Sequence, residues 1–321
     1  MKTHAKLAAL AAAFLVCNAA TAQTYPTKPI WWVVGFAPGG GNDILARVIA
    51  PRLAERLGQQ VLVDNRAGAD GRVAAEYVAK AAPDGYTIMS GASGQMVYNM
   101  GLYKDVPYDP IKSFAPITMI GYTQLLFAVN PSSPAHTLKD FIALAKKKPG
   151  ALFYGSAGSP HIIAFSQFAK ESGIKLENVP YKGDAPANSA VMSNEVTVAA
   201  TGLGNALPLL KAGKMRALGT TGATRSQFAP DIPTIKEQGV DFESVAWTGV
   251  YAPAGTPQPI LDRLYTVLAG ILKEPATNER ILGTGYETNM NGIKPAEFAV
   301  WHKAQLAKWT KVMKDIGIKP Q

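Results

Sequence analysis

The chain has 321 residues, of which 47% are hydrophobic and 17% charged, so it is long enough for one large or two smaller globular domains. Its formal net charge is +9, but the basic residues are dispersed and few aromatic residues lie among them. This pattern argues against nucleic-acid binding and favours a general attraction for anionic solutes. The single cysteine, Cys17, lies in a leader segment, so the rest of the chain has no residue for disulfides, thiolate metal sites or a cysteine nucleophile.

Residues 1–22 have the pattern of a cleaved secretion signal. Two lysines precede a short apolar segment, Leu7–Val16, and Ala20-Thr21-Ala22 has the small-x-small form of a cleavage site. The apolar segment is shorter than the ~20 residues that span a bilayer, and no later segment is long and apolar enough to do so. Val16 precedes Cys17 where a lipoprotein signal needs a small residue, which argues against a lipid anchor. We therefore expect a periplasmic protein.

The first strand is expected at 30–34, and it leads into a glycine-rich turn, Pro38-Gly39-Gly40-Gly41-Asn42, and an amphipathic helix over 44–57. This order places bare backbone N–H groups at the positive end of a helix dipole, which suits an anion. The turn lacks the Lys and Ser/Thr of a P-loop, and Ile44 replaces the third glycine of a dinucleotide fingerprint. The turn therefore favours a carboxylate, unless it only joins the strand to the helix.

Short apolar runs then alternate with helical patterns along the chain. The expected strands are 61–63, 86–89, 125–129, 153–155, 177–180, 196–200 and 215–219. The expected helices are 73–81, one opened by Thr137 with Asp140 and closed by Pro149-Gly150, 161–172, 185–192, 205–211, and three that begin near Pro257, Pro275 and Pro295. This alternation predicts an α/β protein with parallel sheets, whose ligands bind beyond the carboxyl ends of the strands.

A second anion-type turn, 156–161, follows the strand at 153–155 and precedes a helix. It lies in a different half of the chain from the first turn. Two helix N-termini that face each other across a cleft would hold both ends of a small di-acid.

Several ordered segments together resemble a known family. They are 25–30 (YPTKPI), 36–43 (FAPGGGND), 63–68 (VDNRAG), 82–87 (APDGYT), 179–183 (VPYKG), 210–218 (LKAGKMRAL) and 252–257 (APAGTP). In this order and spacing they resemble the Bug-type, or TctC-like, periplasmic solute-binding proteins of tripartite tricarboxylate transporters. The resemblance covers nearly the whole chain after the signal.

The resemblance implies a two-lobed periplasmic-binding-protein fold of the Venus-flytrap type II, with a ligand cleft between the lobes. Lobe 1 would comprise 23–123 and 245–321, and lobe 2 would comprise 124–244. The implied function is reversible capture of a small organic carboxylate and its delivery to a transporter of one large and one small membrane subunit. Such a protein is not an enzyme; it uses no cofactor or metal, binds no nucleic acid, and is expected to be a monomer.

The resemblance also implies ligand-binding residues. In lobe 1 they are Phe36, Pro38, Gly39, Gly40, Gly41 and Asn42, with a neighbouring serine loop that contains Ser90, Ser93 and Gln95. In lobe 2 they are Ser156, Ala157, His161, Tyr181, Thr201 and Gly202. We expect Gly40 to need a glycine, because a β-carbon there would intrude on the ligand and could forbid the required φ.

This sequence departs from the family pattern at Thr201, where an acid is common. We therefore expect lobe 2 to lack a negative group and the ligand to be a carboxylate without a free ammonium, such as a dicarboxylate or an aromatic acid. We expect structural roles for Asp43 as a helix-start acid, Arg66 in a turn, and Trp247 in the core.

Two other function classes remain open from the residues. Gly91-Ala92-Ser93-Gly94-Gln95 nearly matches a hydrolase nucleophile elbow, and His161 is the one histidine placed to act as its base, so a secreted Ser/His hydrolase is the first alternative. No catalytic residue is expected on the binding-protein interpretation. A subunit that passes its ligand to a signalling partner is the second alternative.

Overall fold

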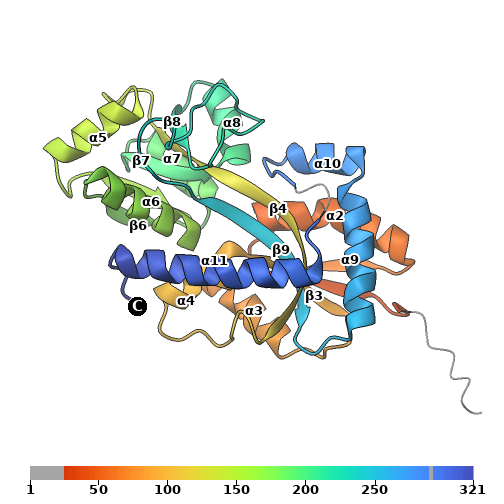
Figure 1. Cartoon of the computed structure of the whole chain (residues 1–321). Helices are drawn as coiled ribbons and strands as arrows, with labels where there is room; N and C mark the ends of the chain where they lie inside the picture. Colours follow the sequence, from red (N-terminus) through yellow and green to blue (C-terminus); the bar gives the residue numbers. More distant parts are fainter. Residues whose placement is uncertain (1–24, 289–291, 321) are drawn as a thin grey trace, which may run out of the picture.

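The protein is described by a computed structural model that covers residues 25–288 and 292–320. The expected signal, including Cys17, lies outside the described residues. Among the helices of the described part, none is long and apolar enough to cross a membrane. Figure 1 shows two groups of helices and strands joined by two long strands, β4 (Phe114–Val129) and β9 (Val245–Pro253).

The first group, called lobe 1 here, is built on a half-sheet in the order β2-β1-β3-β9-β4. Its strands β1 (Ile30–Val34), β2 (Val61–Asn65) and β3 (Thr87–Ala92) are mutually parallel, whereas β9 runs antiparallel to β3 and β4. The helices of this group are α2 (Gly41–Leu57), α3 (Arg72–Ala79), α4 (Asn99–Leu102), α9 (Gln258–Leu272), α10 (Pro275–Leu282) and α11 (Pro295–Asp315).

The core of lobe 1 forms because α2 presents apolar residues at helical spacing to β1. Leu45, Ile49 and Leu53 are fully buried against Ile30, Trp32 and the apolar face of α9. Burial of each such side chain stabilises the fold by about 1.5–3 kcal/mol. The helix ends at Gly58, which adopts φ 71° as a left-handed cap. This packing fixes the N-terminus of α2 directly after β1.

The second group, called lobe 2 here, is built on β4-β7-β5-β6, with β8 paired to β4. Its strands are β5 (Phe153–Ser156), β6 (Glu177–Pro180), β7 (Val198–Gly202) and β8 (Arg216–Thr220), and its helices are α5 (Leu138–Lys147), α6 (Ser159–Ser172), α7 (Asp184–Met192) and α8 (Leu203–Lys211). Phe127 of β4 stacks on Phe165 at 4.3 Å between ring centroids and meets Phe168 edge-on at 5.2 Å. This ring packing holds α6 against the sheet, and the N-terminus of α6 therefore lies directly after β5.

The two long strands connect the lobes. Residues 114–124 of β4 pair with β9, and residues 125–129 pair with β7 and β8. The change of partner lies at 124/125, and β9 begins at Val245. The division into 23–123 with 245–321 and 124–244 stays a prediction, and it agrees with these pairings.

The expected elements are confirmed within a few residues, including the capping box of Thr137 and Asp140 at the start of α5. The expectation of parallel sheets is wrong in part, because β4 and β9 are antiparallel to their neighbours. Neither β9 nor the first half of β4 was expected from the sequence. Both lie centrally and are buried, so they lack the alternation of a half-exposed strand, and Pro116 within β4 sits where the register shifts.

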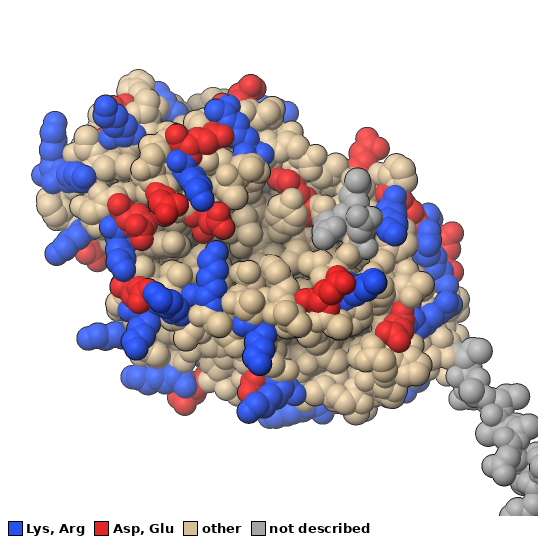
Figure 2. Space-filling model, in the orientation of Figure 1, with Lys and Arg blue, Asp and Glu red and all other residues tan. Residues whose placement is uncertain are grey.

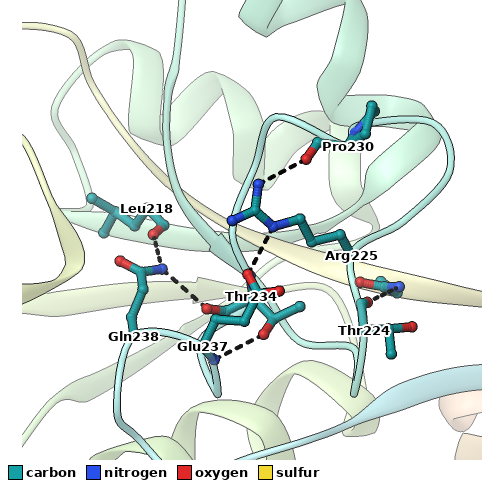
Figure 3. A network of polar contacts seen from close by, with 8 residues as sticks. Leu218, Thr224, Arg225, Pro230, Thr234, Glu237 and Gln238 are labelled. Carbon is teal, nitrogen blue, oxygen red and sulfur yellow. Dashed lines mark hydrogen bonds and ion pairs between the residues drawn. The ribbon is translucent and has the colours of Figure 1, made fainter.

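Residues 221–244 form a long connection from β8 to β9 that polar contacts hold against lobe 2 (Figure 3). Arg225 bonds to the Glu237 carboxylate at 2.8 Å and to the Pro230 carbonyl at 3.0 Å. Gln238 donates to the Leu218 carbonyl at 2.9 Å. The two Arg225 bonds join parts of the connection to each other, and the Gln238 bond ties it to β8, where it flanks the strands that join the lobes.

The charged side chains are mixed over the surface. Figure 2 shows Lys and Arg scattered over the visible face with Asp and Glu among them, and several basic residues take part in ion pairs such as Lys28–Asp84 and Arg225–Glu237. The positive net charge is therefore not gathered into one basic patch on this face.

Candidate functional site

The turn after β1 is organised by a buried carboxylate. Asp43 is 2% exposed and accepts hydrogen bonds from the Gly39 backbone N–H at 2.9 Å, Arg47 Nε at 2.9 Å and Asn65 Nδ2 at 2.8 Å. Burial opposes ionisation of Asp43, but these hydrogen bonds outweigh it and lower its pKa. The predicted structural role of Asp43 is therefore confirmed.

The glycines of this turn have different roles from those predicted. Gly40 has φ −73° and ψ 159°, which any residue can adopt, and a β-carbon there would meet only the Ala37 carbonyl at 3.2 Å. The expectation that Gly40 needs a special φ is wrong. Gly39 is the residue with a left-handed φ, at 79°. Gly41 is the residue with a close neighbour, since a β-carbon there would lie 2.7 Å from the Tyr286 hydroxyl oxygen.

The other predicted lobe 1 residues frame the start of α2. Asn42 Oδ1 accepts a 2.6 Å hydrogen bond from Thr248 Oγ1 of β9, which fixes the amide. Phe36 is partly buried, and its carbonyl accepts from Asn65 Nδ2 at 3.1 Å. Pro38 and Gly39 are exposed. The first N–H groups of α2 have no acceptor within the helix, so the turn keeps donors for an anion.

The predicted serine loop is not a loop. Ser90 belongs to β3, where its Oγ accepts from Trp32 Nε1 at 2.9 Å, and a π-helix spans Gly94–Tyr98. Both ends of Gln95 are engaged within lobe 1, since its Oε1 accepts from Ala92 N–H and its Nε2 donates to the Gly71 carbonyl. Ser93 is 1% exposed, and its Oγ has no hydrogen-bond partner within the described residues. Ser93 is therefore the member of this group with a free polar atom.

The second anion-type turn meets lobe 1 directly. Ser159 begins α6, and its backbone N–H donates to Asp70 Oδ2 of lobe 1 at 3.3 Å. A β-carbon on Gly94 would lie 2.7 Å from Ser159 Oγ, which shows how closely the lobes approach here. The N-terminus of α6 is thus faced by a carboxylate of the protein itself, which corrects the expectation that it is free to hold one end of a di-acid. Asp70 has φ 53°, unusual for a residue other than glycine.

Beside this contact, lobe 2 holds an acid that the sequence analysis missed. The side chain of Asp184, the first residue of α7, is 17% exposed, and its Oδ1 lies 3.2 Å from His161 Nε2 of α6. Its Oδ2 accepts from the Gly202 N–H at 2.9 Å and from Asn205 Nδ2 at 2.8 Å.

Burial alone would raise the pKa of Asp184, but His161, Asn205 and the Gly202 N–H together lower it to about 2. Lobe 2 therefore carries an ionised carboxylate, and the expectation that it lacks a negative group is wrong. The acid stands at the start of a helix and not at position 201.

The remaining lobe 2 candidates lie at the ends of β5, β6 and β7. Ser156 is 1% exposed and its Oγ is unpartnered within the described residues, while Ala157 is partly buried. Thr201 is fully buried, and its Oγ1 accepts from Asn188 Nδ2 at 3.2 Å. The Tyr181 hydroxyl donates to Glu195 at 2.6 Å, so it is not free for a ligand; desolvation and this acid raise its pKa to about 12.

The two turns face a common region between the lobes. Tyr286 of lobe 1 stands against Gly41, and both its burial and the charge of Asp184 raise its pKa, so Tyr286 lies close to the lobe 2 acid. Close by, a β-carbon on Gly204 at the start of α8 would lie 2.2 Å from the Thr284 carbonyl oxygen. The start of α2, Tyr286, Asp184 and His161 therefore lie together along the contact between the lobes.

A cavity of about 330 Å³ lies beside the strands that join the lobes. It is lined by residues of β4, β9, α11, the 221–244 connection and the segment between α10 and α11, among them Tyr122, Gln124, Trp247, Glu287 and Trp301. Trp247 is 3% exposed, as expected for a core residue, and also packs edge-on to Trp301 at 5.0 Å. Neighbouring residues of a strand point to opposite faces, so Trp247 lines this cavity whereas Thr248 points to the start of α2. The cavity and the predicted site are on opposite faces of β9.

The alternative of a Ser/His hydrolase lacks its central contact. No hydrogen bond joins Ser93 to a histidine in the part of the chain that the structure describes. His302 is bonded to the Met96 carbonyl at 3.0 Å, and His136 is exposed. Among the described residues, no three His, Cys, Asp or Glu side chains lie together in a way that could hold a metal ion. Arg66 pairs with Asp64 at 2.7 Å, in agreement with its expected structural role.

Comparisons with known proteins show the family and the fold of the chain. Residues 45–318 match the tripartite tricarboxylate transporter family receptor. An R. palustris protein solved with adipate superimposes with a TM-score of 0.87 at 37% identity, covering 92% of this chain and 100% of the other. The periplasmic binding protein BugD has a TM-score of 0.84 at 31% identity, with 92% and 100% covered.

A third solved structure, MatC from Rhodopseudomonas palustris with bound malate, has a TM-score of 0.81 at 29% identity and covers 90% of this chain and 99% of its own. The α/β periplasmic-binding-protein fold and the absence of an enzymatic role in this group follow from these matches. The chain belongs to the receptor family of the tripartite tricarboxylate transporters, a family of periplasmic solute-binding proteins.

Proposed function

We propose that this protein captures a small organic carboxylate in the periplasm, in the cleft between its lobes. The observation that carries the proposal is the structure at the start of α2. Asp43 accepts a hydrogen bond from the glycine-rich turn, and the N–H groups of the first helical turn have no acceptor within the helix. Relatives solved with adipate and malate support a carboxylate as the ligand class. The expected preference for dicarboxylates or aromatic acids is part of the proposal, and the two relatives support its dicarboxylate half; a missing acid in lobe 2 does not support it, because Asp184 supplies one.

The proposed mechanism is closure around the ligand. A ligand that touches both lobes binds the closed arrangement better than an open one and shifts the population toward it. The two strands that join the lobes supply the hinge, since β4 changes partner at 124/125. The closed protein would then present the acid to one large and one small membrane subunit.

A thermal-shift screen of refolded, ligand-free protein against organic acids tests the proposal. A ligand that binds only the folded state stabilises it by about 2.7 kcal/mol at a hundredfold excess over its Kd. We expect adipate, malate or an aromatic acid to raise the melting temperature and to be recovered unchanged. No response to any acid, or turnover of one, would contradict the proposal.

Delivery is tested separately with the partner subunits. Proteoliposomes that contain a tripartite transporter's membrane subunits should accumulate the acid only when this protein is added. Binding without uptake would support capture but contradict delivery to that transporter.

A further inference from the structure

We propose that the cavity beside the strands that join the lobes is a second binding site, for a small organic cation such as a substituted ammonium. This site is separate from the carboxylate site of the proposed function, because the two lie on opposite faces of β9. Its volume of about 330 Å³ falls within the range of about 300–1,000 Å³ that is usual for small-molecule pockets.

The pairing of β4 with β9 forms the floor of this cavity. Tyr122 lies opposite Trp247 in the ladder, and Gln124 lies opposite Val245. Residues that lie opposite each other, and residues two positions apart along one strand, share one face of a sheet. These four side chains therefore line the cavity together, and Tyr122 and Trp247 make its floor largely aromatic.

The walls of the cavity come from segments that are far apart in the chain. Trp301 of α11 meets Trp247 edge-on, with 5.0 Å between the ring centroids and 75° between the ring planes. Residues 222–224 of the connection also line the cavity, and a β-carbon on Gly222 would lie 2.2 Å from the side-chain amide carbon of Gln124. Two indoles at a steep angle, with a phenol beside them, give the kind of aromatic surface that attracts an ammonium group.

The charge of the cavity is negative. Among the described residues that line it, only Glu287 has a charged side chain. Its Oε2 accepts from the Tyr122 hydroxyl at 3.2 Å and its Oε1 accepts from Ser226 Oγ at 2.9 Å, and both donors are neutral. None of the ion pairs that the described residues form includes Glu287. A partly buried carboxylate is costly without a positive partner, and a cationic ligand would supply that partner.

Two further polar atoms of the lining residues are unpartnered. Gln124 is 5% exposed, and its Nε2 donates to the Thr224 carbonyl at 3.0 Å, but its Oε1 has no hydrogen-bond partner within the described residues. Trp247 Nε1 also lacks a partner there. Buried polar atoms almost always have partners, so these atoms favour a ligand with a polar group of its own. A hydroxyl suits both, because it donates to an amide oxygen or accepts from an indole N–H.

Calorimetry with choline tests the proposal, because choline carries a quaternary ammonium and a hydroxyl. The matched probe is the neutral alcohol in which a carbon atom replaces the choline nitrogen, so that the two probes have the same shape and differ in charge. We expect choline to bind at least about tenfold more tightly, because the carboxylate and the ring faces attract only the cation. Neither probe carries a carboxylate, so the result does not depend on the proposed function.

Two variants test whether the cation binds in this cavity. E287Q keeps the shape of the side chain but removes its charge, and it should weaken choline binding by about tenfold or more. W301L removes one ring face and should weaken choline binding by about 3–30-fold. E171Q removes the charge of an exposed acid on α6 and should bind choline like the wild type. Melting temperatures show whether each variant is folded, and E287Q alone decides if W301L is not.

Three results would overturn the inference. The first is no binding of choline, or equal binding of the two probes. The second is a choline affinity that E287Q leaves unchanged, since the cation would then bind elsewhere. The third is an equal loss in E287Q and E171Q, since it would show only a general attraction between the cation and acidic residues.

Discussion

Replacement of Gly41 by alanine tests how tightly the start of α2 is packed. The added β-carbon would lie 2.7 Å from the hydroxyl oxygen of Tyr286 and 2.9 Å from its Cε2. Real β-carbons almost never come this close, so the ring has to move. Tyr286 is 9% exposed, and a β-carbon added at Gly121 would also lie close to its ring, 3.2 Å from Cδ1. The ring therefore packs near both glycines.

The expected cost follows from these contacts. Overpacking of a core side chain costs about 1–3 kcal/mol, and alanine in place of glycine within a helix returns about 0.5–1 kcal/mol. Gly41→Ala should therefore lower the free energy of unfolding by roughly 1–2 kcal/mol, or a few degrees in Tm for a chain of this size. Adipate affinity should fall at least tenfold, a loss of about 1.4 kcal/mol in binding, because the displaced ring moves along the contact between the lobes.

Gly40→Ala is the matched comparison, since the new β-carbon would meet only a carbonyl oxygen at 3.2 Å and the φ of −73° suits alanine. Its free energy of unfolding should stay within about 1 kcal/mol of the wild type, the scale of N-cap effects. Urea denaturation measures both variants, and calorimetry measures binding. Equal stability of the two variants would refute the argument, since it would mean that Tyr286 moves freely.

Three other predictions follow from particular contacts. Asp184 has a pKa of about 2 when folded and about 3.9 when unfolded, so its ionised form stabilises the fold by roughly 2 kcal/mol above pH 5, and this is lost as the pH falls through 2. Urea melts of Asp184→Asn should differ most from the wild type at pH 6, and the difference should shrink to well under half at pH 2.5; a constant difference would contradict this. Asp70→Gly removes the strain of a left-handed φ, so Tm should not fall, but it also removes the carboxylate that accepts from Ser159 of α6. Small-angle scattering of the ligand-free protein should therefore show a larger radius of gyration. An unchanged radius would argue against Asp70 as a link between the lobes. Mass spectra should show a bound acid unaltered by the wild type and by Ser93→Ala alike. Turnover of the acid by the wild type that Ser93→Ala abolishes would instead support the hydrolase alternative.

The fold followed from the sequence where local signals were strong. Short strands bounded by glycine and proline, and helices with a cap such as Thr137 and Asp140, were placed to within a few residues. The strands that join the lobes were not, because burial of both faces removes the alternating pattern and Pro116 interrupts β4. The antiparallel pairing of β9 depends on contacts between distant segments, which periodicity does not encode.

Several residues of the predicted site lie near one another, but their contacts could not be predicted, and the site itself stays a prediction. The glycine-rich turn, Ser93 and His161 lie near the contact between the lobes, whereas Ser90 and Gln95 are engaged inside lobe 1. Sequence does not tell which of three consecutive glycines has the positive φ or the close neighbour. It also did not indicate Asp184, although an acid directly before Ala185-Pro186 at a helix start is a visible signal. The partner of Asp184, His161, lies 23 positions earlier, too far along the sequence for a local pattern to connect the two residues.

A crystal structure of the refolded protein with adipate is the sharpest test of carboxylate binding at the start of α2. We expect one carboxylate within about 3.2 Å of the backbone N–H groups that begin α2 at Gly41, with the ligand enclosed between the lobes. Adipate in the cavity beside Trp247, on the other face of β9, would contradict the account, as would a bound acid that leaves the start of α2 untouched.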